Sequence, residues 1–507
     1  MGISKIGLDR LNLSQSFPVD MNIGNHRITN LANPTASNDA ATKSYVDGIG
    51  GSRVVSYTIT HDANTIYGYD PSGVLIQSAS YSSLGGFATV LNAIISDINS
   101  KDIGAQIIIS PGVYYPGDID ISEIPPFVTV SGCNYPFSGT YDEALSLTSP
   151  EITRICITNT TNIPIKLYNN GSSIEKVSFF YPDQTGASTI IEYAATIKIA
   201  AHVAVDGVEG NVISYVDLGN AYRGIDLGKN AERAIIEHVV GYPLKYGIVQ
   251  SVDEIYDIID ISDIHFNPKL VGAPGYYDGT IIPDWVKANG IALSINRIDG
   301  LRVDKFFCIF YNIGINIIGP LYRGHFNAFY LDICNYGIFS NNATIGMCDF
   351  SNGHMFCNIL AFCIYGCNLY SSSFIGNEIE CYREGVQFDL SSDSGGNVFT
   401  GCTLRVHRDS DYTSVTRCGL FSGKGFIITS NTFAGIVSTS SQGLYIFNGL
   451  GFVISNNYFT NLEHSTIEIS ETVTTCQISG NISYLTGPFP SDVNTNGKFI
   501  GHNVYSS

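Results

Sequence analysis

The chain repeats one pattern at intervals of about two dozen positions, and this period limits its possible folds more than any other feature. A glycine followed by alternating apolar residues recurs at Gly224, Gly247, Gly290, Gly314, Gly337, Gly385, Gly419 and Gly443. The step from Gly337 to Gly385 is twice the period and hides one more unit at Ala361, whereas the steps from Gly247 to Gly290 and from Gly385 to Gly419 predict long loops. Repeated units of this length, built from short strands, predict a stack of parallel β-coils.

Two other residue types follow the same period. Four cysteines recur at nearly equal intervals of one period, at Cys308, Cys334, Cys357 and Cys381. Asparagines open a second repeated strand pattern, at Asn377, Asn431, Asn457 and Asn481. Stacked asparagine side chains can hydrogen-bond to one another along a ladder. We therefore expect both residue types to point into the coils and to lie above one another.

Length and charge agree with a stack. The 507 residues exceed what one hydrophobic core usually supports, and only 14% of them are charged. The formal net charge of −19 argues against nucleic acid and anionic membranes as partners. The sequence contains neither a recognisable signal peptide nor an apolar run long enough to cross a membrane, so we expect no membrane insertion and twelve reduced cysteines.

A helix is predicted before the repeats begin. Residues 87–101 place apolar side chains at helical spacing, and residues 106–115 read as a strand, a Pro-Gly turn and a second strand. The first coil of a stack would otherwise expose its strand edges and its apolar interior. We interpret the helix as a cap on that coil.

Several segments resemble the tailspikes of bacteriophages. Asp20 to Asp47, with ITNLANPT and DAATKSYVD, is similar to a short module near the N-terminus of many phage tail fibres and tailspikes. The later segments IIISPGVYY, SIEKVSFFYPDQ, PLKYGIVQ and DISDIHFNPKL resemble the pectate-lyase-like β-helix of tailspike depolymerases. The resemblance implies an all-β, right-handed parallel β-helix that forms a homotrimer. It also implies a place in the phage tail of the virion, after assembly in the host cytoplasm.

The resemblance suggests four regions and a set of partners. We expect an attachment module at 1–52, a cap with the first coils at 53–150, the β-helix at 151–483, and a C-terminal end with trimer contacts at 484–507. The N-terminus would contact other phage tail proteins. The ligand would be a bacterial surface polysaccharide, either capsule or O-antigen, which such proteins bind and usually cleave.

A pair of carboxylates is the first candidate for catalysis. Hydrolysis of a glycosidic bond usually needs two carboxyl groups that flank it. Strand alternation places Asn377, Ile379 and Cys381 inward and Glu378, Glu380 and Tyr382 outward. We expect Glu378 and Glu380 to act as acid and base, with Asp332 as a substitute partner. We expect Tyr382 to bind substrate, and neighbouring coils would add substrate-binding residues at His354, Arg405 and His407.

Two further sets compete with this pair. The insertion 267–289 holds Tyr276, Tyr277, Asp284 and Trp285, whose rings could stack on a sugar or simply fix the loop. Asp304 follows the insertion with Asp299 and Arg302, and we count Trp285 and Asp304 among the expected substrate-binding residues. A third acidic set, at Asp253, Glu254, Asp257 and Asp260, reads as a turn and a solvated face.

Several functions remain open at this point. A lyase would need a base beside a uronic carboxylate and a cation to neutralise it, which Arg405 with His407 or Tyr382 could supply. A receptor-binding tail fibre could use the same residues for adhesion alone, and a secreted pectinolytic enzyme is a weaker alternative. The site could also form between chains of a trimer. No calcium loop, zinc motif or phosphate loop is recognisable, so we expect no cofactor and no metal, and packing rather than metal binding for Cys363 and Cys367.

Overall fold

The computed structural model describes residues 55–506, apart from 134–150, 185–188, 202–206, 252–255, 271–280, 392, 408–415, 437–440, 463–465, 485–497 and 501–503. The chain divides into a unit at Met1–Arg53 and a unit at Val54–Ser507. The expected attachment module at 1–52 therefore lies outside the described residues.

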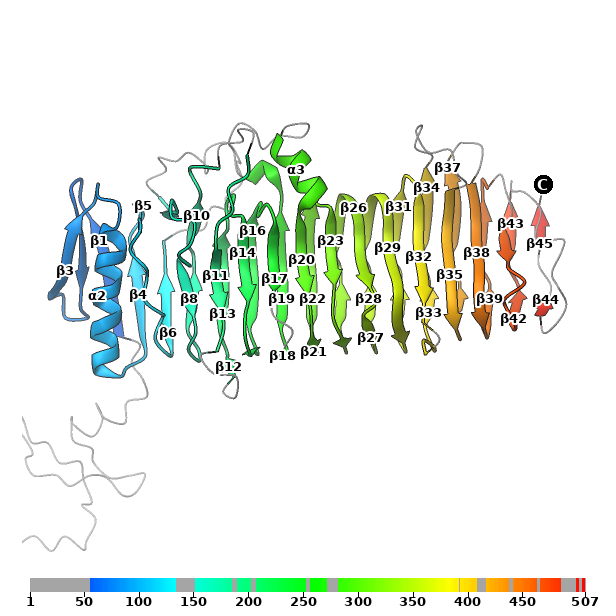
Figure 1. Cartoon of the computed structure of the whole chain (residues 1–507), viewed down its shortest axis with the longest axis horizontal. Coiled ribbons are helices and arrows are strands. Elements are labelled where there is room, and N and C mark those ends of the chain that lie inside the picture. Colours follow the sequence, from blue (N-terminus) through cyan, green and yellow to red (C-terminus); the bar gives the residue numbers. More distant parts are fainter. Residues whose placement is uncertain are drawn as a thin grey trace, which may run out of the picture. The chain divides into compact units, whose positions relative to one another are not determined.

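The second unit is a right-handed parallel β-helix, as predicted (Figure 1). Beyond the cap, its strands pair in parallel with the equivalent strands one coil before and one coil after, which gives their backbone groups hydrogen-bond partners. A coil has three main faces, and short strands such as β24 (Leu321–Tyr322) and β27 (Thr344–Gly346) form a further line of pairing between the third face and the next first face. Strands β28 (Asp349–Ser351) and β30 (Ser373–Ile375) belong to the first face and pair with each other.

The second face follows each first-face strand after a sharp turn. It comprises the start of β26 (Tyr330–Asn341), the start of β29 (His354–Tyr370), β31 (Glu378–Cys381), β34 (Thr403–His407) and β37 (Thr432–Ile436). The third face comprises β20 (Ile291–Ile295), β23 (Ile313–Ile317), the ends of β26 and β29, β32 (Glu384–Leu390), β35 (Thr416–Lys424) and β38 (Ser441–Leu450).

The turn between the first and second faces uses a left-handed backbone in successive coils. Its φ angle is 53° at Asn352, 63° at Gly376 and 66° at Gly401. Glycine and asparagine adopt this conformation at low cost. The turn directs the chain onto the second face, so Glu378 begins β31 directly after Gly376 and Asn377.

The cap contains the predicted helix and strands, together with three further strands that were not predicted. Helix α2 (Gly86–Lys101) and strands β4 (Ala105–Ile109) and β5 (Gly112–Tyr114) lie where the sequence placed them. In addition β1 (Val55–His61), β2 (Thr65–Tyr69) and β3 (Leu75–Ser80) form an antiparallel meander whose first strand pairs with β4. The helix buries Phe87, Val90, Leu91, Ile94, Ile95 and Ile98. It therefore covers the apolar interior of the first coil.

The predicted alignment of the glycines between coils is confirmed at most positions and is wrong at Gly290 and Gly419. Gly224, Gly247, Gly314, Gly337, Ala361, Gly385 and Gly443 share one register, with Ala292 and Cys418 in the remaining places. A Cβ atom at Gly337 would lie 2.6 Å from the carbonyl oxygen of Ala361 in the next coil. Gly290 and Gly419 are out of this register, because each follows a segment that is longer than a regular turn.

The predicted asparagine ladder is present inside the turn. Asn431 Nδ2 donates to Asn457 Oδ1, and Asn457 Nδ2 donates to Asn481 Oδ1, both at 3.0 Å. The oxygens also accept backbone N–H groups of the preceding coil. Cys402 occupies the rung between Asn377 and Asn431, and its backbone N–H donates to Asn431 Oδ1. The ladder satisfies buried polar groups that a turn would otherwise leave unpaired.

The cysteines are all free thiols. Cys334, Cys357 and Cys381 share one register, as predicted. Cys308 departs from it, because it pairs with Leu331, although its sulfur lies 3.8 Å from that of Cys334. These four side chains are fully buried and behave as small apolar groups.

The coils continue to the end of the described chain. Strands β44 (Lys498–Ile500) and β45 (Val504–Ser506) pair in parallel with β42 (Cys476–Ser479) and β43 (Ile482–Tyr484). The region 484–507 thus adds strands to the stack. Within the described ranges, no helix is long and apolar enough to cross a membrane.

Replacing Asn457 by alanine should destabilise the stack by about 2–4 kcal/mol, because the buried Asn431 N–H loses its acceptor and the Asn431 and Asn481 side chains each lose one hydrogen bond. The midpoint of urea unfolding measures the effect. Asn64→Ala is the control, since Asn64 is exposed in the cap. Equal midpoints for the two variants would show that the ladder contributes nothing to stability.

Candidate functional site

The second face carries the expected carboxylates in two outward columns. One column runs through Tyr330, His354, Glu378 and Thr403, and the other runs through Asp332, Phe356, Glu380 and Arg405. Adjacent members lie on paired strands, about 4.8 Å apart. Asn377, Ile379 and Cys381 are buried between these columns, as the alternation predicted. We call the outward set of Asp332, His354, Phe356, Glu378, Glu380, Tyr382, Arg405 and His407 the carboxylate surface.

Glu378 is held in its ionised form. Its Oε1 accepts a hydrogen bond from Arg405 Nη1 at 2.5 Å, and its Oε2 lies 3.9 Å from His354 Nε2. The hydrogen bond from Arg405 is the main reason that the pKa of Glu378 lies below its usual value. Glu378 is half exposed, so this ion pair is screened by water and adds little stability.

Glu380 has a histidine partner instead of an arginine. Its Oε1 lies 2.5 Å from Nε2 of His407, which comes from the next coil. The Tyr382 ring lies 5.3 Å from the His407 ring and 5.4 Å from the Phe356 ring. The charge on this pair depends on whether His407 is protonated.

Asp332 lies in the opposite electrostatic environment. It is partly buried beside Phe356, and burial raises the pKa of its carboxyl group, with a nearby His354 charge acting in the other direction. The surface therefore holds one carboxyl group whose pKa is raised and one whose pKa is lowered. Such a division is common where one carboxyl group donates a proton and another stays ionised.

An aromatic ridge, which was not predicted from the sequence, leads to this surface. Phe307 stacks on Tyr330 with ring centroids 5.4 Å apart, and Tyr330 stacks on His354 at 4.4 Å. His265 adds a tilted contact with Phe307 at 4.4 Å. The rings of Phe307, Tyr330 and His354 cover each other's faces, so they present edges to solvent. Phe307, Tyr330 and His354 follow one another at intervals of one coil, and this spacing is the signal that could have revealed the ridge.

Two expected binding residues lie apart from the carboxylate surface. Trp285 lies on α3 (Ile281–Asn289), where it packs against the core and lies 6.2 Å from the Tyr222 ring. Its ring therefore fixes the insertion on the coils. Asp304 lies before the turn, in register with first-face residues, and accepts a hydrogen bond from Asn327. The position of α3 could not be predicted from the repeat period, because the insertion has no counterpart in other coils.

Among the residues that the structure describes, the other acidic candidates form no second cluster. Arg302 forms a 3.7 Å ion pair with Asp260 on the first face, and Asp299 pairs with Tyr322 in register. Asp257 is exposed. Asp253, Glu254, Tyr276 and Tyr277 lie outside the described residues. In the described part of the chain, no three His, Cys, Asp or Glu side chains are grouped so that they could hold a metal ion.

Comparison with known proteins finds similar folds at low identity. No protein-family model and no curated protein matches the chain. The A-module of a mannuronan C-5 epimerase from Azotobacter vinelandii is 11% identical, with a TM-score of 0.39 over 83% of this chain and 95% of that one. Tailspike protein 3 of bacteriophage CBA120 is 11% identical, with a TM-score of 0.38 over 82% of this chain and 58% of that one.

A third similar structure is the DFA-IIIase from Arthrobacter chlorophenolicus A6 in complex with GF2. It is 13% identical, with a TM-score of 0.39 over 78% of this chain and 90% of that one. At such identities these similarities assign no role to any residue of this chain.

Replacing Arg405 by glutamine should raise the pKa of Glu378 toward its ordinary value, because the hydrogen bond that favours the carboxylate is lost. Carboxyl ¹³C NMR titration of the protein with labelled glutamate measures the change. Arg417→Gln is the matched control, since Arg417 pairs with Glu384 on the third face. If Arg405→Gln leaves the Glu378 titration unchanged, this ion pair does not hold the carboxylate.

Proposed function

We propose that this protein is the body of a phage tailspike, and that its carboxylate surface binds and hydrolyses a bacterial surface polysaccharide. The observation that carries the proposal is the second outward column, in which Phe356 lies between Asp332 and Glu380. An aromatic side chain flanked by two carboxyl groups offers an apolar surface for a sugar ring and an acid-base pair for its glycosidic bond.

Asp332 is the proposed general acid. An acid must carry a proton at the working pH, and the pKa of Asp332 is raised by burial. The sequence pattern predicts Glu378 as the acid or the base. Its lowered pKa argues against it as the acid, and Arg405 already occupies its Oε1. Glu378 with Arg405 is better suited to bind sugar hydroxyls beside the reacting bond.

Glu380 is the proposed base. It lies two strands from Asp332 in the same column, which corresponds to about 9.6 Å between the Cα positions. Inverting glycosidases separate their carboxyl groups by about 6.5–9.5 Å, whereas retaining enzymes need about 5–5.5 Å. Side chains that project in parallel from one column keep roughly the spacing of their Cα atoms, which is nearer the inverting range than the retaining one. We therefore favour inversion, with a water molecule activated by Glu380. His407 would hold the Glu380 carboxylate in position.

Elimination is a weaker alternative. A lyase needs a free cation to neutralise the uronate, and the Arg405 guanidinium is engaged by Glu378. A tail fibre that only adheres to glycan is the alternative from another class, since carboxylates can also hydrogen-bond sugar hydroxyls. Clearing of a host capsule around purified protein tests activity directly.

The phage context rests on the sequence resemblance. In this proposal the chain forms a homotrimer, and the segment 1–52 attaches it to other tail proteins of the virion. The substrate would be capsule or O-antigen. Analytical ultracentrifugation of the full chain tests the trimer, and a monomer in solution would contradict it.

Asp332→Asn and Glu380→Gln should each lower kcat on a susceptible polysaccharide by about 10²–10⁴-fold, because each removes one proton-transfer group. Reducing-end release measures the rate. Asp349→Asn is the control, since Asp349 pairs with His325 on the first face. Normal rates in the Asp332 and Glu380 variants would exclude this pair.

His354→Gln should move the alkaline limb of the pH-rate profile to higher pH. The acid must be protonated, so activity falls as pH rises through the pKa of Asp332, and a protonated His354 lowers that pKa. A profile of kcat/KM against pH measures the limb. An unchanged limb, or a shift to lower pH, would contradict the role of Asp332.

A further inference from the structure

A polar hollow lies near the capped end of the stack, away from the carboxylate surface. It has a volume of about 480 Å³ and is lined by Asn99, Asp120, Ser122, Glu123, Pro125, Pro126, Lys166 and Asn169. Asn99 comes from α2, residues 120–126 join β5 to β6 (Val128–Ser131), and Lys166 lies on β8 (Ile165–Leu167). The volume lies within the range of about 300–1,000 Å³ that is usual for ligand sites.

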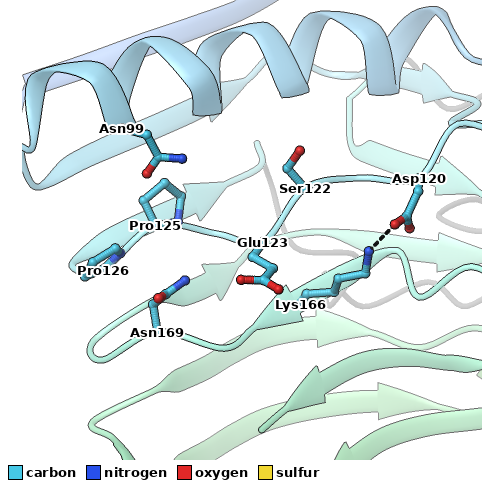
Figure 2. A pocket seen from close by; sticks show the side chains of 8 residues that line it. All are labelled: Asn99, Asp120, Ser122, Glu123, Pro125, Pro126, Lys166 and Asn169. Carbon is cyan, nitrogen blue, oxygen red and sulfur yellow. Dashed lines mark hydrogen bonds and ion pairs between the residues drawn. The ribbon is translucent and has the colours of Figure 1, made fainter. Parts of the chain in front are cut away.

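The walls of the hollow are fixed by hydrogen bonds. Lys166 Nζ donates to Asp120 Oδ2 at 2.6 Å and to the Ile121 carbonyl at 2.9 Å. Asn169 Nδ2 donates to the Ile124 carbonyl at 2.8 Å, and the Asn92 side chain bonds both Asp120 and Ser122. Figure 2 shows Glu123 and Lys166 beneath α2, with Asn99 on the helix above and Asn169 to the left of Glu123. A site that is ordered before binding loses less entropy when a ligand enters.

The charges of the hollow select for a neutral ligand. Asp120 and Glu123 oppose an anion, while Lys166, which is mostly buried at 14% exposure, opposes a cation and already engages Asp120. Amide, hydroxyl and carboxylate groups supply both donors and acceptors, and two prolines supply apolar surface. These groups match a polyhydroxylated ring better than an apolar molecule.

We propose that this hollow is a second binding site, which takes a neutral saccharide unit without cleaving it. From β8, eight successive strand pairings lead to β32, in the coil that contains Glu378. The two places are therefore about 38 Å apart along the stack. The hollow binds independently of the carboxylate surface, and it does not require that surface to be catalytic.

Saturation-transfer NMR on the full chain tests the site with four neutral disaccharides: maltose, cellobiose, lactose and N,N′-diacetylchitobiose. We expect at least one of them to bind. Asn99→Trp, which fills the mouth from an exposed position on α2, and Glu123→Gln, which removes an acceptor, should each weaken that binding about tenfold or more. Glu471→Gln, at a distant exposed position, should leave it unchanged.

Glu380→Gln separates this proposal from the proposed function. Binding that survives Glu380→Gln and is lost in Asn99→Trp supports a separate site in the hollow. The proposal is overturned if none of the four disaccharides binds. It is also overturned if Asn99→Trp and Glu123→Gln bind like the unchanged chain, or if glucuronate or spermidine binds and the neutral probes do not.

Discussion

The whole structure depends on the parallel pairing of each coil with the next one. Because this pairing is in register, a side chain at one position of a coil lies above the side chain at the same position of its neighbour. Each inward column must then contain side chains that can pack against, or hydrogen-bond to, the side chains above and below them in the same column. Phe350 and Phe374 stack at 5.0 Å, and Asn457 bonds to asparagines on both sides. Outward columns are free of this demand and can hold charged groups.

The carboxylate surface follows from the same constraint. Stacking brings residues from separate coils within one or two strand spacings, although they lie far apart in the chain. Glu380 contacts His407 of the next coil, and Asp332 lies two strands from Glu380. Each carboxyl group then takes its properties from the neighbouring coil: Arg405 keeps Glu378 ionised, and burial beside Phe356 favours the protonated form of Asp332. A fold with a uniform backbone thus gives two carboxyl groups different roles.

Features that recur in every coil could be predicted from the sequence. Features in segments that interrupt the repeat could not. Coil length, the cap helix, the asparagine ladder and the outward direction of Glu378, Glu380, His354, Arg405 and His407 follow from period and alternation. Gly290 and Gly419 were placed wrongly because insertions shift the register there. Trp285 could not be placed either, because α3 has no equivalent coil to align with. The antiparallel strands β1 to β3 carry no repeat, and the pKa difference between Asp332 and Glu378 depends on burial, which the period does not reveal.

The stereochemistry of the first products tests the central claim most directly. Proton NMR of a susceptible polysaccharide, recorded within the first turnovers, reports the anomeric configuration of each new reducing end. Asp332 and Glu380, two strands apart, predict hydrolysis with inversion. Retained configuration, or an unsaturated uronate in place of a hydrolysed end, would contradict the account.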